Sequence, residues 1–275
     1  MSFLTEIKSK FQQQGILTQV IILNVAMFLT VNLVGNISHV DLLPYTALPI
    51  GGTSFLFKFW TLFTYMFTHA GLMHLFWNMF LFYFMSQIFF TIMGEKKMLY
   101  VYVMSGLSGG ALVLILGMIF PESFGNSILL GASAAVLGVG AVMALYSPNY
   151  SVFLFGAFEM KYKYFYLLTF AASTIIDLSV NTGGKISHIG GALFGLAYGY
   201  FLKQGKDLSN ISFSFKKKKK LKVVSYNTSF AKSANPKGRS DDEIMNALLD
   251  KISKSGYESL NKTEKDELFK LSQKK

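Results

Sequence analysis

The sequence predicts an all-α membrane protein with six transmembrane helices. Hydrophobic residues make up 52% of the 275 residues and charged residues only 15%, whereas a soluble domain typically carries about 25% charged residues. The apolar residues also gather into six stretches, each close to the roughly 20 residues with which a helix crosses a hydrocarbon core about 30 Å thick. Because the chain has no cysteine, disulfides, cysteine-ligated zinc, iron–sulfur clusters and thiol catalysis are excluded.

The six helices are expected to form one membrane domain over residues 16–203, preceded by a short cytoplasmic segment, residues 1–15. The first apolar stretch is longer than the hydrophobic part of a cleavable signal peptide, and no A-x-A site follows it. We therefore expect this stretch to remain in place as a membrane anchor. The predicted spans are Ile16–Gly35, Leu72–Met93, Met98–Phe120, Gly131–Ser147, Tyr164–Val180 and Ser187–Leu202.

The lysines in the short connections predict the orientation of these spans. Lysine pairs precede the first span and follow the second and the fourth, and the chain after the sixth span is rich in lysine. The opposite side has only Lys58 and Lys185. The positive-inside rule then predicts that both termini are cytoplasmic and that the second, fourth and sixth spans begin at the outer side. We expect a multi-pass protein of a bacterial inner (cell) membrane.

The connection between the first two spans, residues 36–71, is long and unusually aromatic. It contains Phe55, Phe57, Phe59, Trp60 and Phe63, among others. Aromatic side chains favour the membrane interface. We therefore expect a loop that is partly embedded in the outer leaflet and contains short helices, and the alternative is an aromatic belt without a special role.

Four polar side chains are predicted near the outer ends of the even-numbered spans. His74 and Asn78 stand one turn apart on one face of the second span, Ser133 begins the fourth and His188 begins the sixth. Polar groups are costly at this depth, so each is a candidate for function. A hydroxyl and an imidazole can act as nucleophile and general base, and an amide and a second imidazole can stabilise an oxyanion. Taken singly, each could instead serve in packing or in hydrogen bonds between helices.

Other membrane chemistries fit the sequence less well. No H-E-x-x-H motif is present, and Asp177 is the only acid inside the predicted spans, whereas an aspartyl mechanism needs two carboxylates. Metal binding by His69, His74 and His188 remains an alternative, although no metal and no cofactor are expected. A transporter is a third alternative, but the predicted spans show neither an inverted repeat nor a chain of acidic residues that would support it. Asp177 could orient His188 or could be an interfacial polar residue.

Several of these segments together resemble the rhomboid family of intramembrane serine proteases. The matching pieces appear in the family's order, and the resemblance covers roughly residues 12–203. They are the stretch from Trp60 to His69, the segment from His74 to Asn78, Gly131-Ala132-Ser133-Ala134, and His188-Ile189-Gly190-Gly191 with Gly195.

The resemblance implies a rhomboid-like six-helix bundle with a Ser-His dyad that requires no acid. Ser133 would be the nucleophile and His188 its general base. The Ser133 backbone N–H, His74 and Asn78 would form the oxyanion site. Residues that bind the substrate are not implied.

Two positions depart from the family's pattern. Ala134 stands where the family often has glycine, and Leu137 stands where it often has an aromatic ring that packs on the catalytic histidine. The implied activity is hydrolysis of peptide bonds in or next to transmembrane segments of other membrane proteins. The alternative is a catalytically silent rhomboid-like protein that binds client transmembrane helices.

After the sixth span the sequence predicts a flexible basic linker, residues 204–239. Residues 203–239 carry 11 basic side chains and one acid, so most of the net charge of +11 lies just inside the membrane. Residues 216–222 could contact anionic lipids, and the alternative is that this charge only fixes the orientation of the last span. The position of the charge beside a membrane argues against nucleic acid as its partner.

The last segment, residues 240–275, is predicted to be a small helical hairpin in the cytoplasm. Ser240 and Glu243 fit a capping box, Gly256 can end the first helix, and Thr263 with Asp266 resembles a second cap. A unit of this size is marginal as an independent domain. We therefore expect it to bind a cytoplasmic partner.

Overall fold

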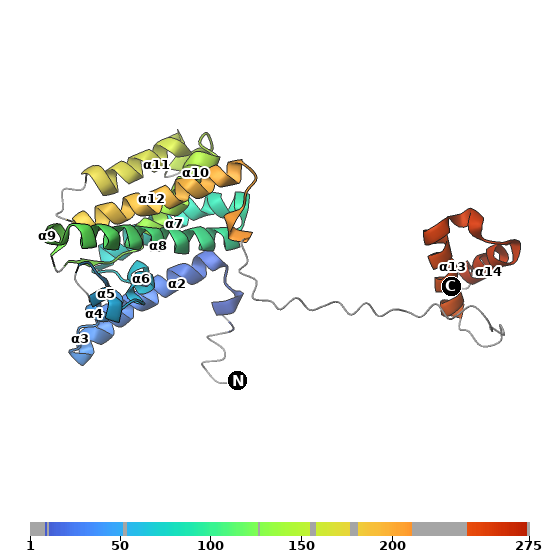
Figure 1. Ribbon diagram of the computed structural model, residues 1–275, viewed down its shortest axis with the longest axis horizontal. Helices are drawn as coiled ribbons and strands as arrows, with labels where there is room; N and C mark the ends of the chain where they lie inside the picture. The colour runs from blue at the N-terminus through green and yellow to red at the C-terminus, as the bar shows by residue number, and fades with distance from the viewer. Residues whose placement is uncertain are drawn as a thin grey trace. The chain divides into compact units, whose positions relative to one another are not determined.

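The structure is a computed structural model that describes residues 9, 11–51, 54–125, 127–154, 158–176, 181–210 and 241–273. The chain divides into two compact units, Met1–Phe213 and Ser214–Lys275. The first unit is a helical bundle that contains elements α2 to α12, and the second contains α13 and α14 (Figure 1).

Each of the six predicted spans corresponds to a helix of the first unit. Among the described residues, three helices are long and apolar enough to cross a membrane, namely Ile16–Ser38, Leu72–Met93 and Glu95–Ile119, and a fourth, Ser133–Tyr146, is apolar but shorter. The bounds are α2 Ile16–Phe28 with its continuations η1 Leu29–Val34 and α3 Gly35–Ser38, α7 Leu72–Met93, α8 Glu95–Ile119, α10 Ser133–Tyr146, α11 Tyr162–Ala171 with its continuation η3 Ala172–Ile176, and α12 Thr182–Lys203.

The predicted start of the sixth helix is wrong by five residues. α12 begins at Thr182 instead of Ser187, because Asn181 caps it: the Asn181 side-chain oxygen accepts a hydrogen bond from the Gly184 N–H at 2.9 Å. His188 therefore lies in the second turn of the helix and not at its beginning.

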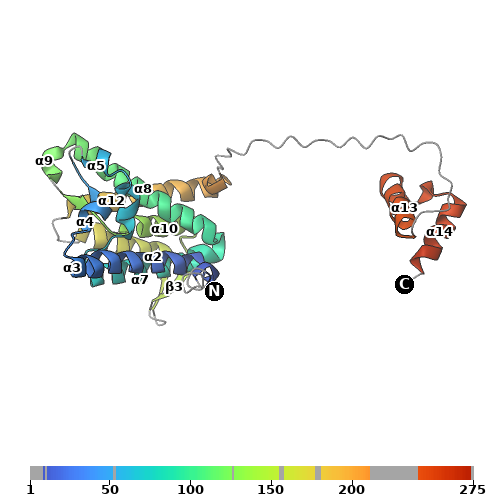
Figure 2. The same cartoon turned by 90° about the horizontal axis from the view of Figure 1, so that it is seen from below.

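Helix α10 lies inside the bundle, where it packs against α12, α8, α7 and α11 (Figure 2). The residues from Ala134 to Met143 are all buried. Glycines allow α12 to approach α10 backbone to backbone. A Cβ on Gly191 would collide with the Ala134 carbonyl oxygen, and a Cβ on Gly195 would collide with the Gly138 carbonyl oxygen. The small-residue spacing of α12 thus allows a direct contact between the backbones of two helices.

The long loop before α7 contains short helices, as the sequence predicts. They are α4 Leu43–Thr46, α5 Ser54–Phe57, α6 Thr61–Thr64 and the 3-10 helix η2 Tyr65–Phe67. Strand β1 Leu48–Pro49 pairs antiparallel with β2 Ile128–Leu129, which follows the short helix α9 Pro121–Phe124. The Tyr65 hydroxyl donates to the Gly106 carbonyl at 2.6 Å. These contacts hold the loop against α8 and against the segment that leads into α10.

The connection between α10 and α11 is a β-hairpin, which the sequence analysis did not predict. Strand β3 Ser151–Leu154 pairs antiparallel with β4 Phe158–Lys161. Only Val152 of the eight strand residues is buried. β4 alternates apolar and polar residues over its four positions, but β3 does not, and a pattern this short does not distinguish a strand from a loop.

A group of hydrogen bonds around Asp207 fixes the end of α12. One carboxylate oxygen accepts from the Tyr198 hydroxyl at 2.9 Å and from the Ser209 N–H at 2.9 Å and hydroxyl at 2.6 Å. The other forms an ion pair with Lys97 at 2.9 Å. Residues 204–210, which the sequence assigns to the linker, therefore belong to the first unit, the membrane unit. The rest of that linker, including residues 216–222, lies outside the described residues.

The second unit is a pair of helices, α13 Asp241–Ser255 and α14 Lys262–Ser272, with the 3-10 helix η5 Tyr257–Ser259 between them. Gly256 ends α13 with a φ of 77°, as expected. The predicted cap at Thr263 and Asp266 is wrong, because Asn261 and Glu264 form the capping box of α14 two residues earlier. The predicted cap residue Ser240 lies outside the described residues.

The contact between α10 and α12 predicts a strong effect of one added methyl group. Gly191→Ala should lower the stability of the membrane unit by about 1–3 kcal/mol, because two buried backbones would have to separate. The midpoint of thermal unfolding in detergent measures the change. Gly71→Ala is the matched control, since a Cβ at Gly71 meets no atom within 4 Å. Equal midpoints for the two variants would contradict this account of the packing.

The Asp207 contacts predict a pH-dependent contribution to stability. Burial by itself would raise the pKa of Asp207, but the hydrogen bonds from Ser209 and Lys97 outweigh it and lower the pKa from 3.8 to about 2. The ionised carboxylate therefore stabilises the fold above about pH 4, and this contribution is lost as the pH falls toward the folded-state value. Asp207→Asn should lower Tm at neutral pH by roughly 2–4 °C.

The difference in Tm between the wild type and Asp207→Asn should shrink as the pH falls below about 4. Glu159→Gln removes an exposed carboxylate of the same unit and is the control. A difference that stays constant over the whole pH range would show that the ionised carboxylate is not the cause.

Candidate active site

Ser133 is the first residue of the central helix α10. The chain reaches it from strand β2 through Gly131, whose φ of +115° is a conformation that glycine adopts easily. The Gly131 N–H donates to the Tyr65 carbonyl at 2.9 Å, which anchors this turn to the long loop. The N–H groups of the first helical turn have no partner within the helix, so Ser133 stands where a negative charge is favoured.

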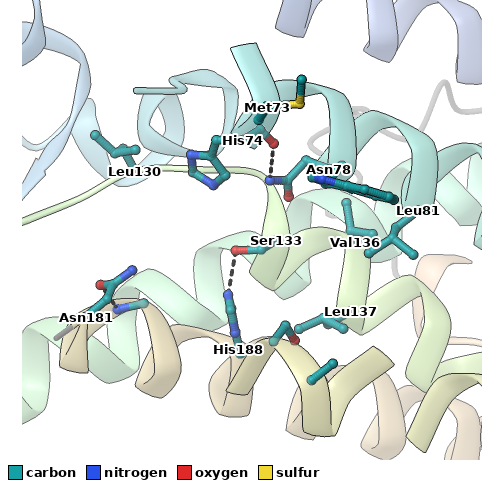
Figure 3. A pocket seen from close by; sticks show the side chains of 14 residues that line it. Met73, His74, Asn78, Leu81, Leu130, Ser133, Val136, Leu137, Asn181 and His188 are labelled. Carbon is teal, nitrogen blue, oxygen red and sulfur yellow. Dashed lines mark hydrogen bonds between the residues drawn. The ribbon is translucent and has the colours of Figure 1, made fainter. Parts of the chain in front are cut away.

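His188 on α12 faces Ser133 on α10, across the glycine contact between these two helices. Its Nε2 atom lies 2.7 Å from Ser133 Oγ, which is a hydrogen-bond distance (Figure 3). The histidine is 9% exposed. Its other ring nitrogen, Nδ1, lies 3.2 Å from the hydroxyl of Thr174 on η3. The sequence analysis placed Ser133 and His188 at one depth, and the structure brings them into direct contact.

His74 and Asn78 lie on α7, across the site from His188 (Figure 3). The His74 ring packs on Gly131: a Cβ added there would lie 2.8 Å from its Nε2 atom and 3.9 Å from Ser133 Oγ. The Asn78 amide donates one hydrogen bond to the His74 carbonyl at 2.8 Å, within the same helix. Both side chains thus border the space in front of Ser133, and the described contacts do not include a hydrogen bond from either one to the serine.

A cavity of about 560 Å³ connects these groups, and its wall is mostly apolar. Its other lining residues could not be found from the sequence, because single apolar, small or uncharged polar side chains carry no signal of their own. The residues that line it are Met73, His74, Trp77, Asn78, Leu81, Leu130, Ser133, Val136, Leu137, Ala172, Ser173, Asn181, Gly184 and His188.

His69 supports His74 from the side of the long loop. The two rings meet edge to face, with their centroids 5.0 Å apart. The His69 carbonyl accepts a hydrogen bond from the Asn32 side chain at 3.1 Å. Within the described residues, His69, His74 and His188 do not form a cluster that could hold a metal ion. Asp177, the acid considered as a partner of His188, lies outside the described residues.

Comparison with known proteins identifies two regions of the chain. A rhomboid domain matches residues 56–205, and a family of unknown function (DUF6576) matches residues 235–274. The chain is 32% identical over 152 residues to RHOMBOID-like protein 6, mitochondrial, of Arabidopsis thaliana. This similarity covers 52% of the chain and 43% of that relative, so the chain spans less than half of the relative's length. Because the rhomboid domain covers more than half of its residues, the chain belongs to the rhomboid family.

Proposed function

We propose that this chain is an intramembrane serine protease that hydrolyses peptide bonds in or next to transmembrane segments of other membrane proteins. The observation that carries the proposal is the 2.7 Å distance between Ser133 Oγ and His188 Nε2. A serine hydroxyl is a weak nucleophile until a base accepts its proton. A buried histidine at this distance is placed to be that base.

The proposed reaction has two steps through an acyl-enzyme. His188 accepts the Ser133 proton as the serine oxygen attacks the peptide carbonyl, and the protonated ring then gives the proton to the leaving amine. Water next attacks the acyl-enzyme, with His188 again as the base. In both steps the carbonyl oxygen becomes an oxyanion, which the Ser133 N–H, His74 and Asn78 stabilise.

The substrate of the proposed reaction is an unwound apolar segment. A transmembrane helix hides its carbonyl groups in its own hydrogen bonds, so the segment must unwind before Ser133 can attack. Residues that weaken helices should therefore be favoured near the cleaved bond. The mostly apolar wall of the cavity suits such a segment, because its apolar side chains then move from lipid to an apolar surface of the protein.

The proposal also includes the membrane topology and the roles of the tail. We infer six spans in a bacterial cell membrane with both termini in the cytoplasm, on the basis of the lysine distribution. The basic residues 216–222 would bind anionic lipids. Residues 240–275 would bind a cytoplasmic partner.

Replacement of the nucleophile is the first test. Ser133→Ala should reduce cleavage of a reporter transmembrane substrate by at least about 10³-fold, because the proposed acyl-enzyme forms on the Ser133 oxygen. It should also abolish labelling by a serine-reactive fluorophosphonate. Ser151→Ala is the control, since Ser151 is an exposed serine of β3.

Undiminished cleavage by Ser133→Ala would contradict the proposal. A wild type that binds client transmembrane helices, but neither cleaves them nor reacts with the fluorophosphonate, would establish the silent binder instead. The fold alone does not separate these outcomes.

The oxyanion donors predict a second, smaller effect. His74→Ala and Asn78→Ala should each lower kcat by about 10²–10³-fold with a much smaller change in KM, because the donors act on the charge that develops during the reaction. Asn36→Ala, at an exposed asparagine after η1, is the control for Asn78→Ala. Changes confined to KM would show that the two side chains bind the substrate and do not stabilise the oxyanion.

A further inference from the structure

The helix that precedes α12 changes its geometry where it passes His188. α11 ends at Ala171, and the chain continues as the π-helix η3, Ala172–Ile176. π-Helical turns are rare and are frequently found at functional sites. In this turn Thr174 is only 7% exposed, while the next residue, Ile175, is 71% exposed. The turn therefore directs one hydroxyl into the bundle.

The Thr174 hydroxyl contacts the side of His188 that faces away from Ser133. Thr174 Oγ1 lies 3.2 Å from Nδ1, and Ser133 Oγ lies 2.7 Å from Nε2, so the imidazole ring lies between two hydroxyl groups from two different elements. Ser173, the neighbour of Thr174, is among the residues that line the cavity, and Thr174 is not. Thr174 is thus placed to act on the histidine and not on a substrate.

A hydroxyl suits this place because the histidine changes its charge during the reaction. A neutral imidazole has one N–H donor and one acceptor, whereas the protonated ring has two donors. When Nε2 takes the proton from Ser133, Nδ1 must carry a hydrogen that needs an acceptor. The threonine oxygen has lone pairs for it, and its own hydrogen can point to Ser173 Oγ at 3.5 Å.

We propose that Thr174 is a positioning residue, which holds the His188 ring toward Ser133 and accepts the Nδ1–H hydrogen bond while the ring is protonated. This inference rests on the proposed protease function. The hydrogen bond becomes stronger when its donor is charged. Thr174 therefore stabilises the protonated histidine more than the neutral one. This difference lowers the barrier of the chemical step, and the affinity for the substrate stays the same.

Three variants test the proposal. Thr174→Val keeps the shape of the side chain and removes the hydroxyl, so kcat should fall about tenfold with little change in KM. Thr174→Ser keeps the hydroxyl and should restore most of kcat. Thr169→Val makes the same chemical change on α11, where the hydroxyl bonds only to backbone carbonyls of its own helix, and should cleave like the wild type.

The rate of fluorophosphonate labelling should follow the same order as kcat, because it reports the reactivity of Ser133 without a peptide substrate. A Thr174→Val variant with the kcat and labelling rate of the wild type would overturn the proposal. A Thr174→Ser variant as slow as Thr174→Val would also overturn it, since the methyl group and not the hydroxyl would then be what matters.

A measurement that needs no turnover separates failure of this inference from failure of the proposed function. The chain has four histidines, so ¹⁵N-labelled histidine gives a simple spectrum in which His188→Gln identifies the signals of His188. The Nδ1 signal should shift in Thr174→Val and not in Thr169→Val. An unchanged Nδ1 signal would contradict the inference, whereas a shifted signal in a chain that cleaves nothing would contradict only the protease function.

Discussion

The backbone contact between α10 and α12 is the constraint on which the rest of the bundle depends. Ser133 and His188 are 55 residues apart in the sequence, and their 2.7 Å hydrogen bond joins the same two helices whose backbones meet at the glycines of α12. Gly191 lies one turn beyond His188 and places its Cα against the Ala134 carbonyl, one residue beyond Ser133. The same glycine contact that compacts the bundle therefore sets the distance between the two reacting groups.

The other elements surround this contact and keep it rigid. α7 supplies His74 and Asn78 from the opposite side, η3 supplies Thr174 behind His188, and the long loop supports the turn that precedes Ser133. Four helical elements, α7, α10, η3 and α12, together with the long loop thus determine the position of one group of side chains. An arrangement held from so many directions leaves the side chains little freedom, which suits a reaction that depends on the exact placement of donors and acceptors.

The sequence predicts the helices of the bundle and the four central side chains well, because both follow from strong and simple signals. Long apolar stretches locate helices, and a polar group in such a stretch is conspicuous. The start of α12 was misplaced because Thr182, Gly183 and Gly184 do not look apolar, and the cap at Asn181 is a local contact. Thr174 could not be identified because threonine is common in membrane helices, and a π-turn leaves no pattern that distinguishes it. Strands β3 and β4 are likewise only four residues long each, too short for a strand pattern to stand out.

The attachments of the long loop have a consequence for how the chain can vary in length. β1 pairs with β2, and Tyr65 is bound to both Gly106 and Gly131, so the loop consists of short closed segments and not one long free connection. Closing a slightly longer segment costs little chain entropy. Extra residues at the exposed positions 39–41, between α3 and α4, would therefore be tolerated. Extra residues between Tyr65 and His74 would shift α7 along its axis and carry His74 away from Gly131.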